Sequence, residues 1–532
     1  MEDELTKVAQ DSARGGFFLI SGTVISTVIL AISSILIARL LGPELYGQYA
    51  LALVVPQLLF LFTDLGINQG ITKFTSDLQS KGETNRIANI IKHGLLLRAT
   101  IGIGIFIINY AFADLIASIL LQRPDLAFYI QLASISILFQ VIFTTATSAF
   151  VGLDKTEYQA LTTNVLATAK TIISIALILI GLSITGAIAG YVISYIVAAV
   201  TGIPLLLLML RKKKKAAKSD GFKTNLKTLF QYGTPLYISV LLTGFLPFFT
   251  SVILALFATD TDIGNYKAAI NFAALLTVLS GPITTVLLPA FSKLNSATSQ
   301  KINRFFRITN KYTAIIIIPI TFLIIIFSNE LVQIIYGSTY ASAPLFLSTY
   351  CLLYFLVGIG YLNLQSLYNG LGETKTTLKI SLISFFALIL LSLPLTQAYG
   401  VQGIIVAFLL ANTMGTLYGA YKARKKFKIE FDSRNILKIY LISLVSSAAP
   451  LLLINFANLP NLLTVAVGGL VYLFSYATLL PLTNVITHSE LRKATLITQN
   501  TRLLSQITKP LFMYQQIILQ LKPVLKKLMF FL

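Results

Sequence analysis

The chain has 532 residues, of which 56% are hydrophobic and 11% are charged, and its mean hydropathy is +0.81. Soluble globular domains carry about 25% charged residues, so this composition excludes a soluble protein and predicts an all-α protein that crosses a membrane many times. The net charge of +21 would suit a nucleic-acid-binding protein, but the cations lie between hydrophobic segments, and this placement argues against nucleic acid as a partner.

Hydrophobic runs of about 20 residues or more, the length that crosses a bilayer, recur along the whole chain. Residues 1–14 are polar and the run that follows them is long enough to span, so we expect a first transmembrane helix rather than a cleavable signal peptide. The sequence predicts about fourteen spans, near residues 16–38, 48–70, 94–120, 127–150, 160–183, 186–210, 230–257, 265–289, 312–335, 342–368, 377–398, 401–421, 437–456 and 461–481.

The Lys and Arg residues are distributed unevenly between alternate loops. Of the 41 cations, 36 lie on the side of the amino terminus, and only Arg39, Arg123 and Lys267 lie on the other side. The positive-inside rule then predicts a multi-pass protein of the cytoplasmic membrane with both termini in the cytoplasm. The RKKKK run at 211–215 is a topology anchor in this interpretation, and it could also contact anionic lipid.

Short motifs recur about 217 residues apart. Gly47-Gln48-Tyr49 returns as Gly264-Asn265-Tyr266, and Gly152-Leu153 returns as Gly370-Leu371. Because six helices separate the copies, both copies enter the membrane in the same direction, and such parallel repeats commonly enclose a cavity near the midplane. We therefore predict two six-helix lobes (1–210 and 229–423), a basic cytoplasmic linker (211–228), helices 13 and 14 (424–483) and a basic amphipathic cytoplasmic tail (484–532), which could instead be partly disordered.

Ionisable side chains inside spans are costly, so they usually face a polar cavity. Lys170 lies near the middle of the fifth span, with Thr163 and Ser174 on the same helix face, and it could attract an anionic substrate head or could pair or snorkel. Arg98 lies one turn into the third span, where its guanidinium could bind phosphate in a bidentate manner or could snorkel. Asp64 could carry a coupling proton or bind a cation, or it could cap a helix end.

Other polar and charged side chains supply further cavity candidates. Asp64, Gln57 and Asn68 fall at positions that share one face of a single helix in the predicted second span. Lys267 and Asn271 lie one turn apart and could line a cavity or anchor the helix at the interface. Amide and hydroxyl groups on other spans could bind sugar hydroxyls or could hold helices together, and they include Gln140, Ser136 and Thr144 on the fourth span and Asn363 and Gln365 on the tenth.

Sequence motifs for catalysis are missing from the chain: no GxxxxGK[ST], HExxH or GxSxG pattern occurs. The single cysteine, Cys351, cannot form an intrachain disulfide, and His93 and His488 are too few for a histidine-based metal cluster. The segment GLGETKT at 370–376 lacks the ending of a phosphate-binding loop and is interpreted as a polar connection between helices. We therefore expect no enzyme activity, no metal and no cofactor.

Four segments carry a resemblance to a known family: RLLGPELYGQYAL (39–51), DLGINQGITKF (64–74), GNYKAA (264–269) and GLGETK (370–375). With them, the chain over about residues 10–480 resembles the polysaccharide-biosynthesis flippases of O-antigen type, which belong to the multidrug/oligosaccharidyl-lipid/polysaccharide exporter superfamily. The resemblance implies a V-shaped, MATE-like pair of lobes that moves a polyprenyl-(pyro)phosphate-linked glycan by alternating access. It also implies coupling to an ion gradient, of H⁺ or Na⁺. Relatives often carry an acidic residue in the seventh helix, but FLPFFTSVILALF (245–257) carries none, which leaves Asp64 as the main candidate.

Two other functions remain open at this stage. A multidrug or cation antiporter of the same superfamily would suit cationic substrates, whereas Lys170 and Arg98 favour an anionic one. A membrane-embedded glycan polymerase or transferase would need clustered carboxylates or histidines, commonly on a large loop, and the longest loop here is the linker. A non-transporting scaffold is a weaker option. For a flippase we expect a monomer that contacts membrane lipids, with glycosyltransferases or a polymerase as possible partners.

Overall fold

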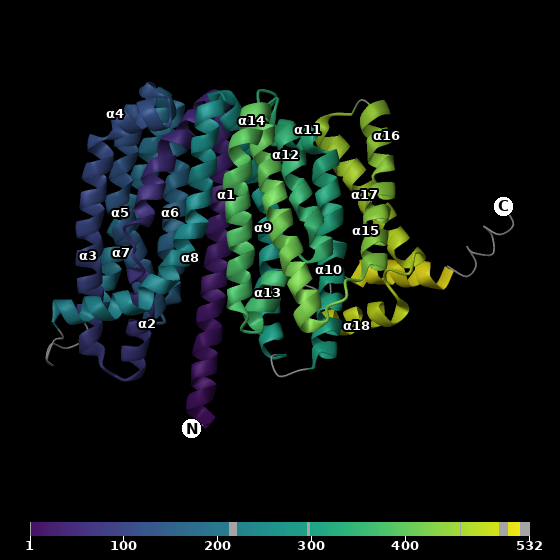
Figure 1. Ribbon diagram of the computed structural model, residues 1–532, viewed down its shortest axis with the longest axis horizontal. Coiled ribbons are helices and arrows are strands. Elements are labelled where there is room, and N and C mark those ends of the chain that lie inside the picture. Colours follow the sequence, from purple (N-terminus) through teal and green to yellow (C-terminus); the bar gives the residue numbers. More distant parts are fainter. Residues whose placement is uncertain (1, 212–220, 295–297, 458, 500–508, 522–532) are drawn as a thin grey trace. The chain divides into compact units, whose positions relative to one another are not determined.

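The computed structural model describes residues 2–211, 221–294, 298–457, 459–499 and 509–521, and these ranges contain helices and turns but no strand. The chain divides into two compact units, Met1–Ala268 and Ala269–Leu532 (Figure 1). Among the described residues, eight helices are long and apolar enough to cross a membrane, or nine if one bent pair counts as a single span. The expected all-α polytopic membrane protein is confirmed, whereas the count of fourteen spans stays a prediction.

The first unit is built from helices, and as far as Arg211 these follow one another with short connections. They are α1 (Glu2–Leu61), α2 (Ile67–Ser80), α3 (Thr84–Ala111), α4 (Ala113–Leu115), the π-helix η1 (Ile116–Leu120), the 3₁₀-helix η2 (Pro124–Leu126), α5 (Ala127–Gly152), α6 (Thr156–Leu177), the π-helix η3 (Ile178–Leu182), α7 (Ser183–Arg211), α8 (Phe222–Phe257) and the first turns of α9 (Asp260–Ser292).

The second unit continues along α9 and ends beyond α18. Its elements are α10 (Ser299–Ile326), α11 (Ser328–Ile335), α12 (Ala343–Cys351), the 3₁₀-helix η4 (Leu352–Ile359), α13 (Asn363–Gly370), α14 (Thr374–Phe427), α15 (Ser433–Ser446), α16 (Ala448–Phe456), α17 (Asn461–Leu482) and α18 (His488–Gln499). Residues 509–521 are also helical. Half of the predicted linker (212–220) and part of the predicted tail (500–508 and 522–532) lie outside the described residues.

Three helical stretches are twice as long as one crossing requires, and each contains a glycine with positive φ. They comprise Ser21–Leu61 (41 residues), Thr156–Leu210 (55 residues) and Thr374–Phe427 (54 residues). At 1.5 Å per residue each would measure about 60–80 Å if straight, against about 30 Å for the hydrocarbon core. The glycines are Gly42, Gly181 and Gly400, with φ of +75°, +94° and +56°.

Contacts on either side of these glycines show that each stretch folds back on itself. Ser34 Oγ lies 2.8 Å from Tyr46 Oη although the two residues are 12 apart in the chain. A Cβ atom on Gly190 would lie 2.3 Å from Ser174 Oγ, and one on Gly415 would lie 2.1 Å from Ser384 Oγ. Each stretch is therefore a helical hairpin. The bends at Gly42 and Gly400 fall between two predicted spans, and the bend at Gly181 falls two residues before the predicted end of a span.

The 217-residue repeat is visible in the packing of each unit. A Cβ atom on Gly152 would lie 2.7 Å from the carbonyl oxygen of Thr72, and one on Gly370 would lie 2.7 Å from that of Leu288. The buried core of the first unit includes Ala146, Ala149, Phe150 and Leu153, and that of the second includes the positions 218 residues later, Leu364, Leu367, Tyr368 and Leu371. Equivalent positions thus pack alike, while the lobe boundaries stay a prediction, since α8 and the start of α9 belong to the first unit by contact.

The predicted second span, 48–70, is wrong in one respect. Helix α1 ends at Leu61, residues 62–66 form a turn, and α2 begins at Ile67. Leu65 and Gly66 have φ of +47° and +84°, a conformation that a continuous helix cannot contain. Gln57, Asp64 and Asn68 therefore do not share one face of one helix.

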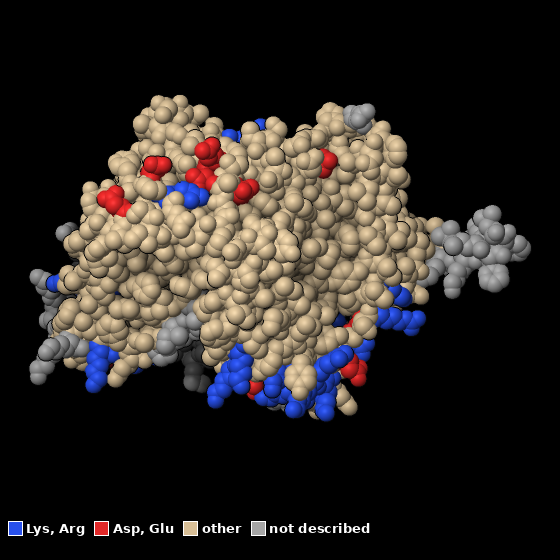
Figure 2. Space-filling model, turned by 45° about the horizontal axis from the view of Figure 1, so that its top comes forward, with Lys and Arg blue, Asp and Glu red and all other residues tan. Residues whose placement is uncertain are grey.

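The basic side chains of the second unit gather at one end of its helices (Figure 2). Arg304, Arg307 and Lys311 lie in the first turns of α10, and Arg424, Lys425 and Lys426 lie in the last turn of α14. Both sets stand where the sequence places loops on the side of the amino terminus. The distribution within this unit therefore agrees with the pattern from which the orientation is predicted.

Candidate functional site

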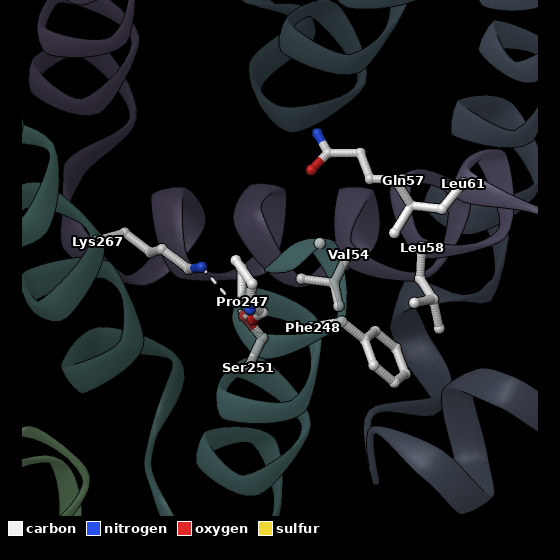
Figure 3. Close-up of a pocket in the computed structure, with 9 residues that line it drawn as sticks. Val54, Gln57, Leu58, Leu61, Pro247, Phe248, Ser251 and Lys267 are labelled. Carbon is white, nitrogen blue, oxygen red and sulfur yellow. Dashed lines mark hydrogen bonds between the residues drawn. The ribbon is translucent and has the colours of Figure 1, made fainter. Parts of the chain in front are cut away.

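A pocket of about 230 Å³ lies in the first unit among α1, α8 and the start of α9 (Figure 3). Most of its wall is apolar, and three polar side chains, Gln57, Ser251 and Lys267, line it as well. A concave, largely apolar site with a few placed polar groups is the usual form of a ligand pocket. The full lining is Val54, Gln57, Leu58, Leu61, Gly244, Pro247, Phe248, Ser251 and Lys267.

The ammonium group in this pocket is held by a hydroxyl relay. Lys267 Nζ donates a hydrogen bond to Ser251 Oγ at 3.1 Å, and Ser251 Oγ donates to the carbonyl oxygen of Pro247 at 2.7 Å. Pro247 and Ser251 are one turn apart on α8, so the hydroxyl stays within the helix and keeps a lone pair for the lysine. Figure 3 shows Lys267 reaching toward Ser251 from the neighbouring helix.

A set of hydrogen-bonded polar side chains is connected to the pocket through Gln57. Tyr191 Oη on α7 accepts hydrogen bonds from Gln140 Nε2 at 3.1 Å and from Gln57 Nε2 at 3.4 Å. The ammonium nitrogen of Lys170 lies 5.3 Å from the centre of the Tyr191 ring, within the range of a cation–π contact. Gln57, Gln140, Lys170 and Tyr191 come from α1, α5, α6 and α7, and we call them the interior polar cluster.

Tyr191 was not among the site residues predicted from the sequence. Tyr191 is 5% exposed and lies about two turns inside α7. A buried tyrosine hydroxyl needs a hydrogen-bond partner. Its partners, Gln57 and Gln140, are 134 and 51 residues away in the chain, so no local pattern in the sequence pointed to them.

Arg98 holds the first unit together in this structure. Its side chain has no exposed surface, and its guanidinium donates to Asn68 Oδ1 at 2.8 Å, Thr145 Oγ1 at 2.7 Å and the carbonyl oxygen of Thr63 at 3.3 Å. Asp64 Oδ1 lies 3.5 Å from Arg98 Nε. Arg98 therefore links the turn after α1 to α3 and α5, and it neither lines the pocket nor snorkels to a surface.

Asp64 is engaged in the same network. Its Oδ1 accepts the backbone N–H of Asn68 at 3.0 Å, so the carboxylate caps the start of α2. Capping was one of the two roles left open for Asp64 by the sequence. Its role in ion coupling stays a prediction.

The other predicted site residues lie elsewhere. Asn363 is fully buried in the second unit and donates to Asn310 Oδ1 at 3.2 Å and Thr313 Oγ1 at 3.3 Å, so in this structure it joins α13 to α10. Gln365 is exposed two residues later. Asn271 follows Lys267 on α9 and belongs to the second unit. The structure thus brings together Gln57, Gln140, Lys170 and Lys267 from the predicted set.

A further charged group in the first unit centres on Asp260. Arg123 Nε lies 2.7 Å from Asp260 Oδ1, Gln48 Nε2 donates to Asp260 Oδ2 at 2.9 Å, and Arg123 Nη2 donates to the carbonyl oxygen of Ala258 at 2.9 Å. We call Asp260, Arg123 and Gln48 the Asp260 clasp. It joins α1, the segment before η2 and the start of α9.

Two glycines of the repeat motif allow this close approach. A Cβ atom on Gly47 would lie 1.9 Å from the carbonyl oxygen of Asp260, and one on Gly264 would lie 1.8 Å from that of Pro43. Pro43 and Asp260 are separated by 217 residues, as are Gly47 and Gly264. The contact of Gly47 with Asp260 is therefore equivalent to that of Gly264 with Pro43, as a local twofold axis between α1 and α9 requires.

The fold and the site define a multi-pass α-helical membrane protein with a polar, cationic pocket among its helices. Residues 12–295 match the family of polysaccharide biosynthesis proteins, which is more than half of the chain, and the chain belongs to this family. It is 22% identical over 380 residues to the "Putative O-antigen transporter" of Shigella dysenteriae, covering 71% of this chain and 92% of that protein. It is 25% identical over 236 residues to the "Probable low-salt glycan biosynthesis flippase Agl15" of Haloferax volcanii, covering 43% of this chain and 48% of that protein.

Solved structures show the fold. The inward closed conformation of the lipid II flippase MurJ superimposes with a TM-score of 0.70 at 19% identity, covering 87% of this chain and 99% of that one. An inward-facing MATE family transporter of the MOP superfamily gives a TM-score of 0.58 at 16% identity, covering 77% and 98%. The expected MATE-like fold is confirmed.

Proposed function

We propose that this protein is a flippase that moves a polyprenyl-(pyro)phosphate-linked glycan across the cytoplasmic membrane by alternating access. It would act as a monomer with both termini in the cytoplasm, and glycosyltransferases or a polymerase would supply and use its cargo. Membership of the polysaccharide biosynthesis family and the similarity to an O-antigen transporter and a glycan flippase, as those two relatives are named, support this assignment. The structural observation on which the proposal depends is the positive charge in the interior of the first unit.

Two ammonium groups in that interior have no carboxylate partner among the described residues. Lys170 contacts the ring of Tyr191, and Lys267 contacts the hydroxyl of Ser251. A cation withdrawn from bulk water without a counter-charge is costly, so the pair favours the arrival of an anion. A phosphate or pyrophosphate on a lipid carrier is such an anion.

The neutral members of the site suit the sugar part of the same substrate. Gln57, Gln140 and Tyr191 offer amide and hydroxyl groups that can exchange hydrogen bonds with sugar hydroxyls. A hydrated headgroup cannot cross hydrocarbon unaided, because each unpaired polar group costs several kcal/mol there. The lipid tail would stay in the bilayer while the polar head passes along the cluster.

The same charge argues against the cation antiporter of this superfamily. A drug cation would meet two ammonium groups, and like charges in a site of low dielectric repel strongly. Asp64 is the predicted residue for coupling transport to an ion gradient. The coupled ion, H⁺ or Na⁺, is to be identified by experiment.

Reconstitution tests the proposal directly. Proteoliposomes with a fluorescent lipid-linked oligosaccharide should exchange it between leaflets, and Lys170→Gln and Lys267→Gln should each lower the rate about tenfold or more, the effect of losing one charge-assisted hydrogen bond. Lys375→Gln, at an exposed position near the start of α14, is the matched control and should exchange at the wild-type rate. Imposed pH and sodium gradients identify the ion.

Two results would refute the assignment. The first is unchanged exchange in both lysine variants. The second is a wild-type protein that leaves the glycan lipid in place but moves a cationic dye against a gradient, because this would make it the antiporter.

A further inference from the structure

A second cavity, of about 390 Å³, lies at the basic end of the second unit. One face of α10 forms one wall, and the start of α15 with the segment from the end of α17 into α18 forms the other. By volume it has room for about a dozen water molecules, at about 30 Å³ each. Its lining is Gln300, Asn303, Arg304, Arg307, Ile308, Lys311, Asp432, Asn435, Asn484, Thr487 and Glu490.

Both carboxylates of the cavity are already satisfied. Glu490 accepts from Lys311 Nζ at 2.8 and 3.0 Å and from the backbone N–H and hydroxyl of Thr487, each at 3.0 Å. Asp432 caps α15 by accepting the backbone N–H of Asn435 at 3.3 Å and its Nδ2 at 2.8 Å. The oxygens therefore have little capacity left for a cation, and the charge of Lys311 is neutralised.

The guanidinium groups of Arg304 and Arg307, in contrast, lack close carboxylate partners among the described residues. Arg304 is exposed and has no ion pair among the described residues, and Arg307 approaches carboxylates only at 3.6 Å (Glu430) and 3.9 Å (Asp432). Three residues apart on α10, they stand on neighbouring turns of one helix face. Each guanidinium carries five N–H donors in a planar fork, so the cavity holds a large excess of unused donors over acceptors.

We propose that this cavity binds a phosphate-bearing anion, held by Arg304 and Arg307 with help from the amide groups of Asn303 and Asn435. A tetrahedral phosphate oxyanion can accept paired N–H donors from each guanidinium, which a single chloride or an ammonium-type ligand cannot do. This site shares no residue with the pocket of the first unit.

The phosphate has two chemical sources, a lipid headgroup and a soluble phosphate ester. The cavity precedes the apolar part of α10, which begins at about Ala314, and its lining includes Ile308, which is 43% exposed. Charged residues just before a span stand at the depth of lipid headgroups, and basic pockets there are suited to anionic lipids. A lipid headgroup thus fits the position, while the ligand chemistry is the same for both sources.

The test uses the full-length protein in a neutral detergent and measures the shift of its melting temperature with added ligand. The cavity variant is Arg304→Gln/Arg307→Gln. The control is Arg424→Gln/Arg434→Gln, which removes the same charge at two exposed residues that do not line the cavity. The ligands are phosphatidylglycerol, zwitterionic phosphatidylcholine, inorganic phosphate and pyrophosphate.

We expect phosphatidylglycerol to stabilise the wild type and the control variant, and the cavity variant to need about tenfold more lipid for the same shift. Stabilisation by phosphate or pyrophosphate with the same dependence on Arg304 and Arg307 would support the site and assign it a soluble phosphate. An equal response of the cavity and control variants to every ligand would overturn the proposal. Because both arginines of the cavity are at least partly exposed, their loss should leave the melting temperature without ligand close to that of the wild type.

Discussion

The Asp260 clasp permits a quantitative prediction from its geometry. Arg123 and Asp260 are 26% and 14% exposed and lie 2.7 Å apart, so their interaction is screened less than that of a surface pair. A hydrogen bond to a charged group contributes about 1.5–3 kcal/mol to stability. Asp260→Asn leaves a neutral side chain of the same shape, whereas Arg123→Gln also removes the bond to Ala258. We therefore expect Arg123→Gln to be the more destabilising single change.

A double-mutant cycle isolates the pair from these side effects. Each single variant should lose about 1.5–3 kcal/mol, and the double variant Arg123→Gln/Asp260→Asn should lose about as much as Arg123→Gln alone, which gives a coupling energy of that size. For a domain of this size 1 kcal/mol corresponds to about 2–4 °C of melting temperature. Thermal unfolding of the purified protein, followed by intrinsic tyrosine fluorescence, measures the four variants.

The control cycle uses Lys81→Gln and Asp77→Asn, an exposed pair at 57% and 42% whose atoms lie 2.8 Å apart. Its coupling should be below about 1 kcal/mol, as for other surface ion pairs. Additive losses at Arg123 and Asp260, or equal coupling in the two cycles, would show that burial does not strengthen the clasp and would refute the reasoning.

Three further predictions concern packing, a buried charge and pH. Gly264→Ala should lower the melting temperature by several degrees because its Cβ would overlap the carbonyl oxygen of Pro43. Gly104→Ala is the control and should be nearly neutral, because nothing lies within 4 Å of a Cβ atom there. Equal effects of the two substitutions would contradict the close contact. Arg98→Met should lower the stability by about 3–5 kcal/mol and reduce the folded yield, because it leaves Asp64 and its neighbours without their partner. Asp64→Asn in the same chain should recover part of this stability. A fully stable Arg98→Met protein would contradict the prediction. Partial burial alone would raise the pKa of Glu490, but the bonds from Lys311 and Thr487 outweigh it and lower that pKa below its ordinary value. The attachment of α18 should therefore persist at pH 5 and weaken as the pH falls through the lowered pKa, seen as faster hydrogen exchange over 488–499, and Glu490→Gln should abolish this step.

The helices themselves were largely predictable from the sequence. The ends of the predicted spans fall close to Gly42, Gly181 and Gly400, where the structure bends, because a positive φ at glycine costs little and ends a helix. The repeat was also readable, since the glycines that recur at 217 or 218 residues are those at which backbones approach closely. Small residues at such contacts leave a trace in the sequence that larger core residues do not.

The charged contacts were not predictable in the same way. The partners of Arg98 on α5 and the carboxylate partner of Arg123 are 43–47 and 137 residues away in the chain, and no local pattern links them. The turn at 62–66 was hidden as well, because Phe62, Leu65 and Ile67 continue the hydrophobic run through it. Hydropathy indicates whether a segment lies in lipid or water and not its backbone conformation, so a turn that includes apolar residues within a long hydrophobic run is predicted as helix.

The charges of the first unit separate structural from binding roles by their partners. Arg98 and Arg123 lie against Asp64 and Asp260, so their charges are balanced within the protein and removing either one leaves an unbalanced carboxylate. Among the described residues, Lys170 contacts the ring of Tyr191 and Lys267 contacts the hydroxyl of Ser251, and neither has a carboxylate partner, so neutralising them relieves a cost that the described part of the protein does not offset. The arginine variants should therefore lose stability, whereas the lysine variants should keep their stability and lose binding of the anionic substrate. This opposite response distinguishes a binding site from a packed interior.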